Sequence, residues 1–427
     1  MSSGSHGESD PSNEFGTIAC VWCRKNHKRC DKTVPSCKNC SLRGLVCEYM
    51  TPKRRQYPKR IRNSNVSENS RNSSQVEEEQ HEAPIVHLTL QQVLDIYVNV
   101  LYGMFSLMAV PPNDLEQYFT EMQVGMPLSH DVNALIYSIR ALCEQMKGML
   151  DAANESVKLA LSELAHTFHV LNRNTVPTYS YLSFYESGFG RLKNARFYLT
   201  FGKAYVQELE ENPDENYDKL RVAKRGIAIW ELNCSGDNIL DFKRWPESFE
   251  KNVGVPLPPE LSDLFHREID ASNYQVFLQV AELLPQLSLN DPLLKIHVES
   301  RRSQEFWFSV VIHGFRLQIL KQCGCESELA EKTALILTDC FENEYFCWCT
   351  PLTLSVVICV AQYHLELVKS IERGEKIAFQ TSVNYYTVLQ KDLHALQSLN
   401  NKLKRVELFH GDLLKEMSEV IQHKKIN

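Results

Sequence analysis

The chain has 427 residues with 43% hydrophobic side chains, enough for a sizeable core, and its 17 glycines and 17 prolines are few enough to favour helices. Its net charge of −7 is unevenly distributed, because residues 17–62 hold 13 Lys and Arg against two acidic residues, a net +11. The remaining residues therefore carry −7 − 11 = −18. This predicts a basic N-terminal segment that binds polyanions and an acidic remainder of the chain that does not. No apolar run reaches the roughly 18 residues of a membrane span, and the first residues lack a signal-peptide pattern. We therefore expect neither a membrane protein nor a secreted one. In a reducing compartment we expect the cysteines to stay reduced.

After a polar N-terminus (1–18) that we expect to be disordered, residues 19–49 contain six closely spaced cysteines. A CxxC pair followed by a third cysteine after six residues occurs twice, giving Cys20, Cys23, Cys30, Cys37, Cys40 and Cys47. Two tetrahedral zinc ions need eight ligand positions, and six thiolates fill them only if two thiolates each bind both ions. The spacing therefore favours a binuclear cluster with two Zn²⁺ ions. The alternatives are a zinc module used only for folding or protein contact, a disulfide-stapled domain and an iron–sulfur site.

This segment resembles the fungal-type binuclear zinc cluster family of DNA-binding transcription factors. The likeness rests on all six cysteines, on Arg24 after the second cysteine, on Asp31 after the third, and on Pro35 two residues before the fourth. It implies that Cys20 and Cys37 are the bridging ligands and that Pro35 shapes the loop between the halves. One zinc ion would bind Cys20, Cys23, Cys30 and Cys37, and the other would bind Cys37, Cys40, Cys47 and Cys20.

The run RKNHKR lies between the second and third cysteines and predicts a short, metal-anchored basic helix. Such a helix suits the phosphate backbone and major groove of DNA. The resemblance implies contact with a CGG-like triplet through two central basic side chains, and this chain has Asn26 and His27 at those positions. We expect these two residues to read bases, since neutral His can donate to guanine and Asn prefers adenine edges. The expected phosphate contacts are Arg24, Lys25, Lys28, Arg29, Lys38 and Arg43.

Residues 50–84 read as a linker that is first basic and then polar. The basic part is expected to serve nuclear import or to contact the DNA backbone through Lys53, Arg54, Arg55, Lys59, Arg60 and Arg62. The alternative is a solvated linker without either role. Residues 63–84 are Ser, Asn, Glu and Gln with almost nothing apolar, which predicts a disordered tether.

Residues 85–427 predict one large all-helical domain, because apolar residues recur at helical spacing and alternation with period two is scarce. Thr89 and Gln92 form a capping-box signature within the apolar series that runs from Val86 to Met104. A similar series follows a predicted helix start at Asp291-Pro292. We favour a buried first helix for 86–104 over a dimerising coiled coil, because the seam covers fewer than three heptads. By position and helical character, the domain resembles the regulatory domains that follow zinc clusters in this family.

The body shows no pattern typical of catalysis. It contains no Walker loop, no GxGxxG after a strand, no GxSxG and no HExxH, so we expect no enzyme activity. The stretch FCWC at 346–349 is apolar and aromatic, which favours buried structural cysteines over a redox or metal sensor.

Together these features predict a small, irregular, zinc-stabilised N-terminal DNA-binding module followed by a large all-α domain. The leading hypothesis is a nuclear, sequence-specific transcription regulator that binds double-stranded DNA and recruits transcription machinery or chromatin proteins, as a monomer or a homodimer. One alternative is an architectural protein of centromere or chromatin. Another is a ligand sensor whose helical domain binds an apolar small molecule.

Overall fold

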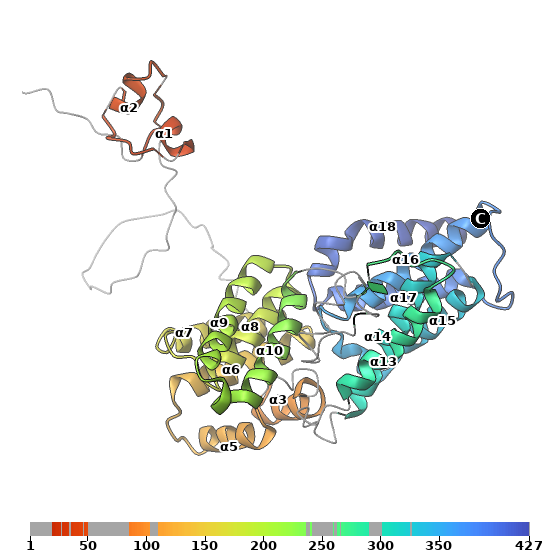
Figure 1. Cartoon of the computed structure of the whole chain (residues 1–427), viewed down its shortest axis with the longest axis horizontal. Helices are drawn as coiled ribbons and strands as arrows, with labels where there is room; N and C mark the ends of the chain where they lie inside the picture. The colour runs from red at the N-terminus through yellow and green to blue at the C-terminus, as the bar shows by residue number, and fades with distance from the viewer. Residues whose placement is uncertain are drawn as a thin grey trace, which may run out of the picture. The chain divides into compact units, whose positions relative to one another are not determined.

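The chain forms two separate compact units, Met1–His81 and Glu82–Asn427 (Figure 1). They are called the cluster unit and the helical body below. The computed structural model describes residues 19–26, 28–33, 36–45, 47–49, 85–102, 110–235, 240, 259, 263–264, 266–289, 301–324 and 327–426. Among these residues the cluster unit is small and rich in cysteine, and the body is helical without a strand. The predicted fold class is therefore confirmed.

The first half of the body is a stack of helices built around α6. Its elements are α3 (Leu90–Ile96), η1 (Tyr97–Leu101), α5 (Pro112–Gln123), α6 (His130–Met146), α7 (Leu150–Leu164), α8 (Thr175–Gly188), α9 (Leu192–Glu210) and α10 (Pro213–Ser235). One face of α6 carries Leu135, Ile139 and Leu142 toward α3 and α5. Another face carries Ala134 and Ala141 toward α7, where small side chains let the two helices approach closely.

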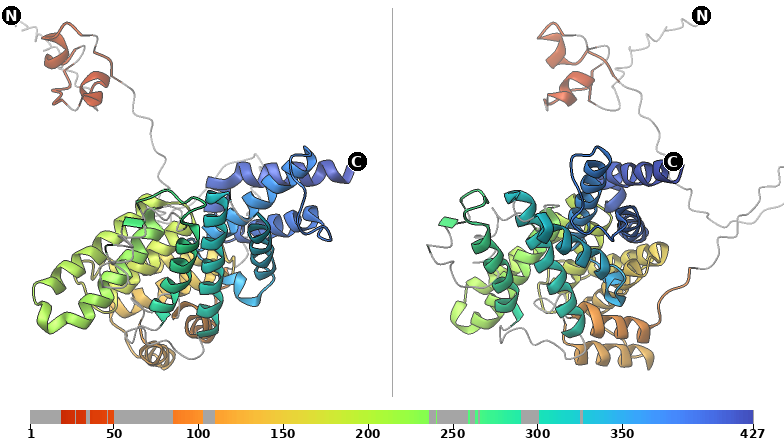
Figure 2. Two further views of the ribbon diagram at one scale, coloured as in Figure 1. Left: turned by 45° about the vertical axis from the view of Figure 1, so that its right-hand side comes forward. Right: turned by 90° about the vertical axis from the view of Figure 1, so that its right-hand side faces the viewer.

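The second half of the body surrounds α16. Its elements are α13 (Tyr274–Leu289), α14 (Arg301–Cys323), α15 (Ser327–Cys340), η3 (Glu344–Trp348), α16 (Leu354–Glu372), α17 (Tyr385–Asn400) and α18 (Arg405–Ile426) (Figure 2). By length and hydropathy α16 matches a membrane span, yet 61% of its apolar window is buried inside the body. Val356, Val360 and Ala361 are fully buried in the largest core cluster. Packing against neighbouring helices thus accounts for the apolar composition of α16.

The first helix of the body begins where its capping box predicts. The Thr89 hydroxyl accepts a hydrogen bond from the Gln92 N–H (3.2 Å), and the Gln92 side chain accepts one from the Thr89 N–H (2.9 Å). This reciprocal pair satisfies two backbone donors that a helix start leaves open. Val86 lies before the cap and is 73% exposed, so its assignment to the helix was wrong.

The expectation of a buried first helix holds for its later residues. Val93, Tyr97 and Val100 are buried, and the Tyr97 hydroxyl donates to the Val110 carbonyl at 2.7 Å. The helix changes to π-helical geometry at Tyr97–Leu101. Met104 and the predicted helix start at Asp291-Pro292 lie outside the described residues.

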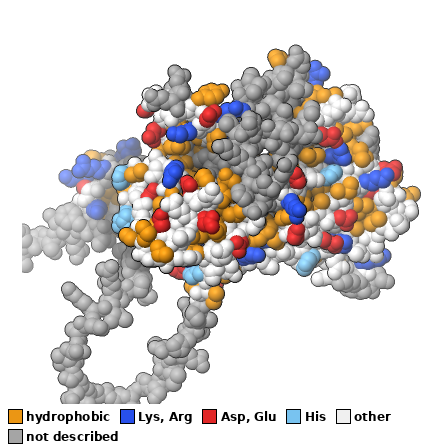
Figure 3. Space-filling view, turned by 90° about the horizontal axis from the view of Figure 1, so that it is seen from below, with side chains coloured by type: hydrophobic (Ala, Val, Ile, Leu, Met, Phe, Trp, Pro, Cys, Tyr) orange, Lys and Arg blue, Asp and Glu red, His pale blue; other side chains and the backbone are white. Residues whose placement is uncertain are grey.

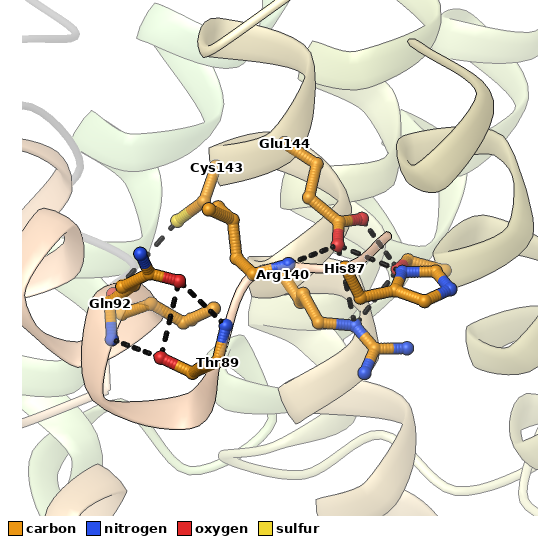
Figure 4. Close-up of polar contacts among 9 residues, drawn as sticks. His87, Thr89, Gln92, Arg140, Cys143 and Glu144 are labelled. Atoms are coloured by element: carbon orange, nitrogen blue, oxygen red, sulfur yellow. Dashed lines mark hydrogen bonds and ion pairs between the residues drawn. The ribbon is translucent and has the colours of Figure 1, made fainter. Parts of the chain in front are cut away.

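The segment that precedes this helix is fixed to α6 by one buried carboxylate (Figure 4). Glu144 is fully buried, and its Oε1 lies 2.9 Å from Nδ1 of His87 and accepts from the Leu88 N–H at 3.2 Å. Its Oε2 accepts from the Ser156 hydroxyl at 2.7 Å, and Nε of Arg140 lies 3.9 Å from Oε1. A buried carboxylate is tolerated only when donors surround it, so these contacts define where the body begins.

We predict that Glu144→Ala destabilises the helical body by about 3 kcal/mol, because it removes the acceptor shared by a backbone N–H and three side chains. Urea unfolding of the full-length protein followed by tryptophan fluorescence measures the change. The matched control is Glu155→Ala on α7, whose carboxylate is on the surface beside Lys158 and whose loss is expected to change stability by less than about 0.5 kcal/mol. Equal effects of the two substitutions would contradict the anchoring role of Glu144.

Candidate zinc cluster and nucleic-acid interface

The cluster unit consists of the same local turn made twice, 17 residues apart. Helix α1 (Val21–Lys25) follows Cys20, and α2 (Lys38–Ser41) follows Cys37. In each half the N-cap cysteine accepts the first helical hydrogen bond on its carbonyl, at 3.0 Å for Cys20 and 2.9 Å for Cys37. The second cysteine of each CxxC pair also accepts an N–H on its carbonyl from five residues further on, at 2.9 Å in the first half and 3.0 Å in the second. The repeat therefore gives the two N-cap thiols equivalent positions.

The six sulfur atoms form two sets of four that share two members. The first set is Cys20, Cys23, Cys30 and Cys37, and the second is Cys20, Cys37, Cys40 and Cys47, with all Sγ atoms of a set within 4.8 Å of one another. The Sγ of Cys20 lies 3.8 Å from that of Cys37 and 3.6 Å from that of Cys40. Tetrahedral zinc with Zn–S bonds of about 2.3 Å needs sulfurs roughly 3.8 Å apart. The geometry fits two zinc ions, and the shared members are the two cysteines expected to bridge.

The pKa values of the cysteine thiols also indicate that the cluster binds metal cations. Burial, together with hydrogen bonds and Coulombic repulsion from neighbouring thiols, raises the pKa of Cys23 to about 12, and burial raises that of Cys37 and Cys40. Burial also acts on Cys30 and Cys47, but backbone N–H groups outweigh it and lower the pKa of Cys30 to about 7 and that of Cys47 below its usual value. Six thiolates at this spacing coexist only with divalent ions, which reduce the charge of the cluster from −6 to −6 + 4 = −2.

Polar contacts hold the chain between the two halves. The carboxylate of Asp31 accepts from the Thr33 hydroxyl at 2.9 Å and from the Lys38 N–H at 3.0 Å, so it links the end of the first half to the start of α2. The Tyr49 hydroxyl donates to the Thr33 carbonyl at 2.9 Å and lies 3.9 Å from the Sγ of Cys30. Asp31 was identified from the family pattern. Tyr49 was missed, and its only signal was an aromatic residue two positions after the last cysteine, Cys47. Pro35 lies outside the described residues.

The basic helix is shorter than expected. Of the run RKNHKR, only Arg24 and Lys25 lie within α1, and Asn26 is its C-cap. The Asn26 side-chain amide donates to the Trp22 carbonyl at 3.0 Å, which helps to end the helix. The prediction that four cations share one helix was therefore wrong, since Lys28 and Arg29 lie beyond the end of α1 and outside any helix.

All six cations predicted to contact phosphate are nevertheless exposed on the cluster unit. The Arg43 guanidinium lies over the Trp22 ring at 5.3 Å from the ring centre, which places a cation of the second half beside α1. Asn26 is also exposed. His27 and the six cations of the predicted basic linker, Lys53, Arg54, Arg55, Lys59, Arg60 and Arg62, lie outside the described residues.

The cysteines of the body behave differently from those of the cluster unit. Cys349 is buried as expected, but Cys347 is exposed, so the prediction for FCWC was only half right. The reason is that η3 is a tight 3₁₀ turn, which points nearby side chains to different sides. Within the described part of the body, no group of Cys, His, Asp or Glu comes together as the cluster sulfurs do.

Comparison with known protein families identifies the cluster unit. Residues 18–56 match the family model of the fungal Zn(2)-Cys(6) binuclear cluster domain. The chain therefore carries a domain of the class found in fungal zinc-dependent DNA-binding transcription factors, and a domain of this class binds two zinc ions. No curated protein matches the chain.

We predict that Cys37→Ala abolishes folding of the cluster unit, because this thiol belongs to both sulfur sets and its loss leaves both ions one ligand short. Zinc content of the purified full-length protein should fall from two ions per chain to fewer than one, as measured by inductively coupled plasma mass spectrometry. The matched control is Cys347→Ala, an exposed cysteine of the body, which should retain both ions. Two bound ions in the Cys37→Ala protein would overturn the ligand assignment.

Zinc binding should also release protons and weaken as the pH falls. The pKa values of Cys23, Cys37 and Cys40 lie above the usual thiol range, so at pH 7 each is protonated without metal and must lose its proton to bind zinc. We expect release of three or more protons per chain and a loss of affinity between pH 8 and pH 6. Calorimetric titration in buffers of different ionisation enthalpy counts the protons, and release of fewer than two would contradict this account.

Proposed function

We propose that this protein is a nuclear, zinc-dependent, sequence-specific transcription regulator. The observation that carries the proposal is the pair of four-sulfur sets that share Cys20 and Cys37, within a segment that matches a family of DNA-binding domains. The two zinc ions fix the fold of the cluster unit. The exposed cations around it then form a rigid surface for double-stranded DNA.

The charge of the described cluster unit supports DNA as its partner. Residues 19–49 carry seven Lys and Arg and two acidic residues, a net +5, and the zinc-loaded cluster adds −2, which leaves +3. The helical body is different: on the face shown in Figure 3, acidic and basic side chains are interspersed among apolar ones. Attraction to phosphate is thus concentrated in the small unit.

Base recognition is assigned to Asn26 and His27, with a CGG-like triplet as the proposed target. Asn26 sits at the end of α1 and uses one amide hydrogen on the Trp22 carbonyl, so its other amide hydrogen and Oδ1 are available to a base edge. Arg24 and Lys25 on α1 would contact the flanking phosphates. The basic stretch at 53–62 would follow the DNA backbone or direct nuclear import.

The helical body is assigned regulation and recruitment of transcription machinery or chromatin proteins. Its large apolar cores give a stable platform, and the contacts of Glu144 define where the helical body begins along the chain. We propose no catalytic role for the body. An architectural role in chromatin is the competing assignment, and it requires DNA binding without a transcriptional effect.

We predict that full-length, zinc-loaded protein selects sites that contain CGG-like triplets from random duplexes. Asn26→Ala and His27→Ala should relax the preference within the triplet, because they remove donors to base edges. Lys28→Ala should instead weaken binding to all sequences alike and reduce the salt slope of log K by about 0.9. The matched control is Arg373→Ala, an exposed cation of the body paired with Glu375, which should change neither property.

The failure of this selection has a definite meaning. If no sequence is enriched while zinc is fully bound, the cluster unit binds the DNA backbone without reading bases. A reporter assay with the helical body fused to an unrelated DNA-binding domain then tests whether the body affects transcription. Loss of both sequence preference and transcriptional effect would replace the regulator with the architectural assignment.

A further inference from the structure

Three buried polar residues are linked by hydrogen bonds in the interior of the helical body, far from the zinc cluster in sequence. They are Ser187 at the end of α8, Asn233 in the last turn of α10, and Arg405 at the start of α18. Nη1 of Arg405 donates to the Ser187 hydroxyl at 3.0 Å, and this hydroxyl donates to the Asn233 carbonyl at 2.9 Å. The exposed fractions are 0% for Ser187, 1% for Asn233 and 7% for Arg405.

Three side-chain atoms of this group have no hydrogen-bond partner. Nε of Arg405 and both side-chain atoms Nδ2 and Oδ1 of Asn233 are buried without a hydrogen bond. Such groups are rare in folded proteins, since each has lost its water without a replacement. Nε of Arg405 and Nδ2 of Asn233 are both donors, and two unpaired donors in one linked group indicate a missing acceptor.

The missing acceptor should be negatively charged. In the part of the chain that the structure describes, no carboxylate lies within ion-pair distance of Arg405. Burial lowers the pKa of Arg405, and this effect outweighs the opposing contribution of the nearby Cys234 thiol. A buried guanidinium without a counter-ion is costly, and a guanidinium is the side chain best shaped to bind an oxyanion with two parallel hydrogen bonds.

The surroundings hold the Arg405 guanidinium in place. Its aliphatic part packs against the tight turn at Gly190, where an added Cβ would lie 3.4 Å from the Cβ of Arg405 and 2.7 Å from Leu408. The guanidinium carbon lies 5.8 Å from the centre of the Phe409 ring. The C-terminal end of α10 offers a partial negative charge nearby, but its Asn233 carbonyl already accepts from Ser187 and does not satisfy Nε or Nδ2.

We propose that Arg405, Asn233 and Ser187 form a buried binding site for an oxyanion, the carboxylate or phosphate group of a small solute. The oxyanion accepts hydrogen bonds from the Arg405 guanidinium and from Nδ2 of Asn233, while Ser187 keeps the guanidinium oriented. Because the group joins the two halves of the body, a bound anion stabilises the packing of α18 against α8 and α10. This site is independent of the zinc cluster and of DNA binding.

The test uses full-length, zinc-loaded protein with inorganic phosphate and with succinate as probes, each against sodium chloride at the same ionic strength. Thermal unfolding and calorimetric titration report binding. We expect one or both probes to raise the melting temperature of the body by roughly 2 °C or more at concentrations well above Kd, and the probe that acts identifies the class of oxyanion. Zinc content and DNA binding should not change.

Variants separate a binding site from a structural contact. Asn233→Leu replaces an unsatisfied amide with an apolar group of similar size, so it should fold and should lose at least tenfold in affinity for the anion. Arg405→Lys keeps the charge but loses the two-pronged donor, so it should also weaken binding. The matched control Arg373→Gln on the surface should respond to both probes as the wild type does.

Two outcomes would overturn the proposal. One is that neither probe binds or stabilises the wild type, or that Asn233→Leu and Arg405→Lys respond to the probes as the wild type does. The other concerns Asp237 and Asp241, which follow α10 in the sequence. Strong energetic coupling of either one to Arg405 in a double-mutant cycle would show that the chain itself supplies the acceptor.

Discussion

The sharing of two thiolates between two metal sites is the constraint on which the cluster unit depends. Six cysteines fill eight tetrahedral positions only when Cys20 and Cys37 each belong to both sulfur sets, and the structure brings their Sγ atoms to 3.8 Å. Each of these residues is also the N-cap of a short helix, so ligand position and helix position are set together. The exposed cations take their places from those helices and from the turns that follow them. Under the proposed function, DNA recognition is therefore coupled to metal binding.

The helical body follows a different physical logic. Its stability comes from apolar side chains packed between long helices, and polar groups that enter the interior need partners to replace the water they lose. Glu144 illustrates the rule, because its carboxylate is fully buried and accepts hydrogen bonds from the backbone and from Ser156. The group around Arg405 departs from this rule. Other buried polar atoms, such as Oγ of Ser303 and Nε1 of Trp307, also lack a partner, but at Arg405 and Asn233 two such residues are linked through Ser187.

Local signals in the sequence were the reliable ones. The capping box of Thr89 and Gln92 predicted the start of the first helix, because its atoms lie within one turn. Periodicity alone was less secure. It placed Val86 in the helix although the cap excludes it. The basic helix predicted after the first CxxC pair was also too long, because a side-chain hydrogen bond from Asn26 to Trp22 ends it. Burial of FCWC was misjudged at Cys347, because composition does not show how a 3₁₀ turn orients its side chains.

The sequence by itself determined the metal, the number of ions and the class of the N-terminal domain. The reason is that the spacing of six cysteines within 28 residues fixes which thiolates can bind the same ion. It also determined that the body is helical, since that follows from repeated short-range patterns. Only the tertiary structure decided which side chains of the body meet. Ser187 and Arg405 are 218 residues apart, and Asn233 belongs to a third helix. No local pattern encodes their contact, which arises because packing of the apolar faces brings the three helices together.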